Sequence, residues 1–132
     1  MDRNGQYLFG LKVSDKARAA GYFRDCYNDR GLFAVMSANL DKEFSWWQTV
    51  GRKDLSFTED GELTLKGAKQ WRAELAPDIE RFVALDELYE GQAKTSRKLS
   101  PPQTQKYRDW ATGLLTFLDL AISKKSSIIF SV

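Results

Sequence analysis

Residues 54–66 read DLSFTEDGELTLK, and this stretch decides the fold more than any other part of the chain. Apolar residues stand at alternate positions on both sides of the turn signal Asp60-Gly61: they are Leu55, Phe57, Leu63 and Leu65. A two-residue turn would scatter these side chains over both faces of a hairpin. A three-residue loop with Gly61 in the left-handed conformation places all four on one face, because it pairs Phe57 with Leu63. The sequence therefore predicts a bulged hairpin over about 55–65, in which Leu55 also pairs with Leu65.

Two helices are predicted directly after the hairpin. The first begins at about Leu65 or Lys66, and Pro77 ends or kinks it because the residue before a proline is disfavoured in a helix. Pro77 also suits the first turn of a second helix. The apolar positions of the two helices are Ala68, Trp71, Leu75, Ile79, Phe82, Val83 and Tyr89. Residues 91–100 hold few apolar side chains, so we expect a solvated linker or a frayed helix end there.

The segment Ser100-Pro101-Pro102 is a strong helix start, with a capping serine followed by prolines. The helix should run to about Ser123. It carries one broad apolar stripe: Tyr107, Trp110, Ala111, Leu114, Phe117, Leu118, Ala121 and Ile122. Residues 127–132 (SIIFSV) predict a final strand that pairs with the first strand or with the hairpin.

The N-terminal part of the chain begins with an alternating pattern over residues 6–13, which is typical of a half-buried strand. Ser14 is a suitable N-cap for a helix to about Asn28. Gly31 is expected to close that helix.

Residues 32–36 are ambiguous between a short buried strand and the start of a helix. Asn39 is a good N-cap for a helix through about Val50. One face of this helix would carry Leu40, Phe44 and Trp47. Trp46 would point away from that face, so either a second layer covers it or a partner can reach it.

These elements together predict a single α+β domain over residues 1–132, with four to five helices packed on a small, mostly antiparallel sheet. The length of 132 residues suits one domain, since domains commonly hold about 100–150 residues. A hydrophobic share of 42% and a charged share of 29% are ordinary for a globular protein. No apolar run approaches the roughly 20 residues that cross a membrane, and residues 1–5 do not read as a signal peptide, so we expect a cytoplasmic location.

The chain contains no histidine and one cysteine, Cys26. Ser-His-Asp and Cys-His nucleophilic systems, histidine acid–base catalysis and Cys/His zinc sites are therefore excluded within one chain. Neither GxxxxGK[ST] nor GxGxxG occurs, so no nucleotide-binding loop is expected. We expect no catalytic residues, no metal site and no cofactor. An enzyme that uses carboxylates or lysine would need these groups to converge in a deep pocket.

Charge is segregated along the sequence behind a net charge of +2. Residues 31–90 hold 7 Lys/Arg and 12 Asp/Glu, whereas residues 91–132 hold 7 Lys/Arg and 2 Asp/Glu. The C-terminal third contains a loose basic stretch: Lys94, Arg97, Lys98, Lys106 and Arg108. These side chains could bind phosphates or an acidic protein surface. Alternatively, they are solvated, or they form ion pairs with the acidic middle segment of the same molecule.

The hairpin leads into a helix through the residues Leu63-Thr64-Leu65-Lys66-Gly67. This order resembles the wing-to-helix junction of some bacterial winged-helix regulators. The resemblance covers about a dozen residues and implies DNA binding. The upstream helix that would enter the major groove carries Asp41, Glu43 and two tryptophans, with basic residues at Arg52 and Lys53. Helices that read the groove usually expose Arg, Lys, Asn or Gln.

We therefore expect a non-enzymatic protein-binding module, such as a small inhibitor, immunity or adaptor protein. One expected partner surface combines Trp46 with the acidic hairpin tip, which consists of Glu59, Asp60 and Glu62. The other is the basic stretch from Lys94 to Arg108. A winged-helix-like regulator that binds nucleic acid is the alternative. The oligomeric state and the identity of the partner are left open by the sequence.

Overall fold

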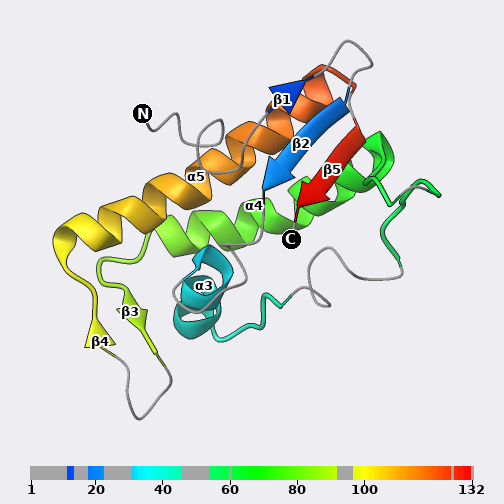
Figure 1. Cartoon of the computed structure of the whole chain (residues 1–132). Coiled ribbons are helices and arrows are strands. Elements are labelled where there is room, and N and C mark those ends of the chain that lie inside the picture. The colour runs from blue at the N-terminus through cyan, green and yellow to red at the C-terminus, as the bar shows by residue number, and fades with distance from the viewer. Residues whose placement is uncertain are drawn as a thin grey trace.

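The computed structural model describes residues 12–13, 18–22, 31–45, 54–59, 61–91, 97–125 and 127–131, and Figure 1 shows their arrangement. The elements in chain order are β1 (Lys12–Val13), β2 (Arg18–Tyr22), α3 (Leu32–Leu40), α4 (Leu65–Val83), β3 (Tyr89–Glu90), β4 (Arg97–Lys98), α5 (Pro101–Ser123) and β5 (Ser127–Ser131). The long helices α4 and α5 lie side by side, and α3 packs against both. Within the described ranges the prediction of four to five helices is wrong, since these ranges hold three.

Helix α5 begins and ends where its sequence predicts. The Ser100 side chain accepts a hydrogen bond from the Gln103 backbone N–H at 3.3 Å, and the Gln103 side chain accepts one from the Ser100 N–H at 3.1 Å. This capping box satisfies two N–H groups that the first turn would otherwise leave without partners. The predicted stripe is buried along the helix at Tyr107, Trp110, Ala111, Leu114, Phe117, Leu118 and Ala121.

Helix α4 runs without a break through Pro77, so the prediction of two separate helices is wrong. A proline inside a helix costs about 3 kcal/mol through a lost hydrogen bond and a clash with the preceding turn. Trp71 and Leu75 before the proline, and Ile79 and Phe82 after it, are all at most 3% exposed. Burying each such side chain contributes roughly 1.5–3 kcal/mol, so the packing of both halves offsets the proline.

Helix α3 resolves the ambiguity at residues 32–36 in favour of a helix. Gly31, which was expected to close a preceding helix, is the N-cap of α3, and residues 23–30 before it lie outside the described residues. The predicted helix from Asn39 to Val50 is wrong in its described part, because Asp41 has a φ of 52° and ends α3 there. Beyond it, the Phe44 N–H donates to the Ser37 hydroxyl at 3.0 Å. Five of the nine α3 residues are buried apolar side chains, and packing of this short segment outweighs the local capping preference of Asn39.

The main sheet has the strand order β1-β2-β5, with β1 antiparallel to β2 and β2 parallel to β5. It is therefore a mixed sheet, whereas a mostly antiparallel one was predicted. Strand β2 lies inside the predicted helix 15–28, so that prediction is wrong for residues 18–22. The physical reason is pairing: five consecutive β2 residues match five of β5, and such tertiary contacts override weak helical propensity. A second, two-stranded antiparallel sheet joins β3 to β4.

The hairpin at 55–65 forms in the predicted register at its centre. Phe57 bridges Leu63, and Gly61 is left-handed with a φ of 82°. The predicted Leu55–Leu65 pair does not form a ladder, because Leu65 is already the first residue of α4. Leu63 also exchanges two backbone hydrogen bonds of 2.8 Å with Ile128 of β5, so the predicted pairing of the C-terminal strand with the hairpin is confirmed.

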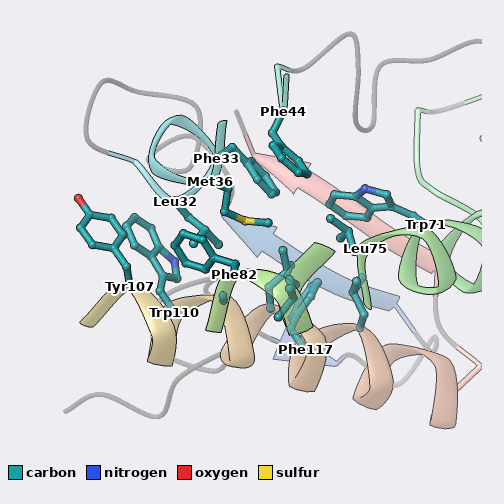
Figure 2. Packing of buried hydrophobic residues seen from close by; sticks show 14 of the residues in the cluster. Leu32, Phe33, Met36, Phe44, Trp71, Leu75, Phe82, Tyr107, Trp110 and Phe117 are labelled. Carbon is teal, nitrogen blue, oxygen red and sulfur yellow. The ribbon is translucent and has the colours of Figure 1, made fainter. Parts of the chain in front are cut away.

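One cluster of buried side chains joins the three helices. Figure 2 shows α3 contributing Leu32, Phe33 and Met36, α4 contributing Trp71, Leu75 and Phe82, and α5 contributing Trp110 and Phe117. Phe44, from the segment after α3, stacks on Phe33 with ring centroids 6.3 Å apart and an interplanar angle of 9°. Leu88 and Leu99 extend this core beneath β3 and β4, and so fix the two-stranded sheet to the helices. None of the described helices is both long and apolar enough to cross a membrane.

Candidate partner-binding surface

The two-stranded sheet presents the most exposed aromatic group in the described part of the chain. Tyr89 of β3 is 38% exposed, whereas every other large hydrophobic side chain described is more covered. We call its surroundings the β3–β4 surface, which consists of Glu87, Tyr89, Glu90, Arg97 and Lys98. Leu88 precedes β3 and Leu99 follows β4, so they face each other at one end of the antiparallel pair; both are buried, and the Leu99 N–H donates to the Leu88 carbonyl at 2.8 Å. Leu88, Glu90 and Leu99 are therefore on the buried side of the ribbon, and Tyr89 and Lys98 are on its exposed side.

A carboxylate connects the two strands at the centre of this surface. The Tyr89 hydroxyl donates to Glu87 Oε2 at 2.9 Å, and Lys98 Nζ lies 2.9 Å from Glu87 Oε1. The hydrogen bonds from Lys98 and then Tyr89 lower the pKa of Glu87. The hydrogen bond to Glu87 raises the pKa of Tyr89 and also that of Lys98. At neutral pH the three groups are thus a carboxylate, a neutral phenol and an ammonium ion, whose net charge is zero.

A second pair crosses the same two strands. Arg97 Nη2 donates to Glu90 Oε1, and the Glu90 side chain is only 11% exposed while that of Arg97 is 66% exposed. A carboxylate that is largely removed from water needs a partner of opposite charge, and Arg97 supplies it. Arg97 and Lys98 are therefore both paired with acidic residues of the middle segment.

Arg108 of α5 reaches the end of α4. Its Nη2 donates to the Leu85 carbonyl and lies 3.4 Å from the Asp86 carbonyl oxygen. Leu85 and Asp86 follow Ala84, the C-cap of α4, and a cation near this end is favourable because the C-terminal end of a helix is negative. Arg108 thus joins α5 to the segment that leads into β3. Lys106, two residues before Arg108, is exposed, and its Nζ lies 5.1 Å from the centroid of the Tyr107 ring.

The predicted site residues fall in two separate places. Glu59 is exposed on the hairpin, and Glu62 accepts a hydrogen bond from the Ser127 hydroxyl at 2.6 Å. The hairpin precedes α4 and the β3–β4 surface follows it, as Figure 1 shows, so the length of α4 separates them. A helix of 19 residues is roughly 28 Å long. Trp46, Asp60 and Lys94 lie outside the described residues.

The sequence interpretation missed Tyr89 and Glu87, because it assigned Tyr89 to the apolar face of a helix. The burial pattern over 88–90 is buried, exposed, buried, which is the alternation of a strand. In the sequence the charged Glu90 hides this alternation, because it occupies a buried position only through its pairing with Arg97.

The arrangement favours recognition over acid–base chemistry. A general acid or base works best with a pKa near the working pH. The pKa of Glu87 is shifted down and that of Tyr89 is shifted up, so both move away from neutrality. No cluster of three or more carboxylate or cysteine side chains suited to a metal ion occurs among the residues described. Comparisons of the chain with known protein families, with curated proteins and with solved structures found no match.

Proposed function

We propose that the chain is a non-enzymatic protein-binding module, of the kind represented by small inhibitor, immunity or adaptor proteins, and that it binds through the β3–β4 surface. The observation that carries the proposal is the exposure of the Tyr89 side chain, at 38%, beside the ion pair of Glu87 and Lys98. Tyrosine is enriched at interface hot spots, because it combines a large apolar ring with a polar tip.

The setting of Tyr89 also favours binding by an ordered surface. Its hydroxyl is bonded to Glu87, which Lys98 holds from the neighbouring strand. A side chain that is already ordered loses less conformational entropy on association. The charged pairs around it would form the polar rim that surrounds the central contact in typical interfaces.

A protein partner is favoured over nucleic acid on the same surface. Phosphate binding requires cationic groups that are free to neutralise phosphates, and it releases the counterions of the nucleic acid. Arg97 and Lys98 already face Glu90 and Glu87, so a phosphate would compete with these carboxylates. We propose a cytoplasmic location for the binding, since the single cysteine does not call for an oxidising compartment.

The proposal is tested by affinity purification from the native host, with and without nuclease, with the whole chain as bait. Tyr89→Ala should lose most of the protein captured by the wild type, while Tyr89→Phe should retain most of it because the ring remains. Lys69→Ala, an exposed change on α4, is the matched control, and Glu59→Ala probes the hairpin tip. Undiminished capture by Tyr89→Ala, or capture that nuclease abolishes, would contradict the proposal.

A further inference from the structure

The side chain of Asn39 makes three hydrogen bonds from the last turn of α3. Its Nδ2 donates to the Val35 carbonyl at 2.7 Å and to the Tyr89 carbonyl at 2.8 Å. Its Oδ1 accepts from the Tyr89 N–H at 2.9 Å. The amide thus binds both backbone polar groups of a residue that lies 50 positions later in the sequence.

This contact closes one edge of the small sheet. Tyr89 stands opposite Lys98 of β4, yet its own N–H and C=O both bind Asn39. The amide therefore stands where the backbone of a further strand would lie. A two-stranded ribbon is marginally stable by itself, so support at its edge orders the residue that the edge carries.

We propose that Asn39 is a positioning residue, which fixes the backbone of Tyr89 and so presents its ring to the partner. The inference rests on the proposed function of the β3–β4 surface. An amide is required because one group must donate to a C=O and accept from an N–H of the same residue. Aspartate has the same shape but, when ionised, cannot donate, and it would place its charge beside the carbonyl oxygens of Val35 and Tyr89.

The first test is amide hydrogen exchange, residue by residue, in the free protein. In Asn39→Ala the Tyr89 N–H should exchange about five- to tenfold faster, the change expected for one lost hydrogen bond, whereas Asn39→Asp keeps an oxygen that can accept from this N–H and loses only the donor to the Tyr89 carbonyl. The Leu99 N–H, which donates to Leu88 and not to Asn39, should keep its rate. Ala38→Asp is the matched control, since it adds the same charge at an exposed neighbouring position.

The second test is the affinity of the same variants for the protein that the wild type captures. Both Asn39 variants should weaken binding by about five- to tenfold, because each loses the hydrogen bond to the Tyr89 carbonyl, while Ala38→Asp should bind like the wild type. In Asn39→Ala, an unchanged Tyr89 exchange rate, or faster exchange at both Tyr89 and Leu99, would overturn the positioning role. Unchanged affinity of the Asn39 variants would also overturn it, and the proposed function would stand if Tyr89→Ala still weakened binding. If Tyr89→Ala had no effect either, both proposals would fall.

Discussion

Asp78 shows how single residues hold the helices around this core. The carboxylate lies on α4 at 6% exposure, with Lys42 Nζ 2.8 Å from one oxygen and Arg81 Nη2 2.7 Å from the other. Burial by itself would raise its pKa, but the hydrogen bonds and charges of Lys42 and Arg81 outweigh burial and lower the pKa. Lys42 follows α3 in the chain, so this pair fixes the segment after α3 to α4.

The lowered pKa of Asp78 predicts a dependence of stability on pH. A carboxylate with a lower pKa in the folded state stabilises the protein above its unfolded pKa of about 3.9, and this contribution is lost as the pH falls through the folded pKa. Asp78→Asn should therefore lower the free energy of unfolding clearly at pH 7 and much less at about pH 3. Urea unfolding at both pH values measures the difference. Glu80→Gln, an exposed change on the same helix, should show no such pattern, and an equal loss at both pH values for Asp78→Asn would contradict the account.

At the scale of elements, the junction between hairpin and α4 depends on a close approach at Gly67. Thr64 caps α4, since its side chain accepts from the Gly67 N–H at 3.1 Å. A Cβ on Gly67 would lie 2.5 Å from Leu63 Cδ1 and 2.7 Å from the Ser56 carbonyl oxygen. That oxygen cannot move freely, because it accepts hydrogen bonds from both the N–H and the hydroxyl of Thr64.

Gly67→Ala should therefore destabilise the protein although alanine is the better helix former. The gain in helix propensity is about 1 kcal/mol, and overpacking against fixed backbone costs about 1–3 kcal/mol. The difference is a net loss of up to about 2 kcal/mol in the free energy of unfolding, measured by chemical denaturation. Lys69→Ala on the same helix should stay within about 0.5 kcal/mol of the wild type. A variant at Gly67 that is as stable as the wild type would show that the junction relaxes.

Elements with local causes could be predicted from the sequence, and elements with distant causes could not. Ser100 and its prolines specify the start of α5, and Gly61 specifies the hairpin loop, within a few residues of chain. Strand β2 and the path of α4 through Pro77 depend on β5 and on α5, which lie far away in the sequence. The candidate site divides in the same way: Arg97 and Lys98 were predicted from composition, but the exposure of Tyr89 follows from a strand pairing that the sequence does not reveal.

Over the whole molecule, the fold brings the acidic middle segment against the basic C-terminal third. Lys98 pairs with Glu87 and Arg97 with Glu90 across the small sheet. The pair of Arg72 with Asp119 of α5, at 2.8 Å, has the opposite sense, since its basic member lies in the middle segment, and it does not reduce the charge difference between the two segments. The pairs at Arg97 and Lys98 thus partly cancel the charge segregation seen in the sequence. This agrees with the alternative in which the basic residues form ion pairs with the acidic segment.

This cancellation predicts a weak dependence of partner binding on salt. A protein that neutralises 6–10 phosphates loses about 10³–10⁵ in affinity between 50 and 200 mM salt. Binding through the β3–β4 surface should change by less than about tenfold over that range, because its charges are already paired and are screened at the surface. Titration of the captured partner at the two salt concentrations measures this ratio. A steep loss would favour the nucleic-acid alternative.

The most direct test of the central claim is the affinity of the captured partner for the wild type and for Tyr89→Ala, measured by calorimetry with purified proteins. We expect Tyr89→Ala to weaken binding by about tenfold or more, while its melting temperature stays close to that of the wild type because the side chain is exposed. Equal affinities would show that the β3–β4 surface does not bind the partner, and would contradict the claim.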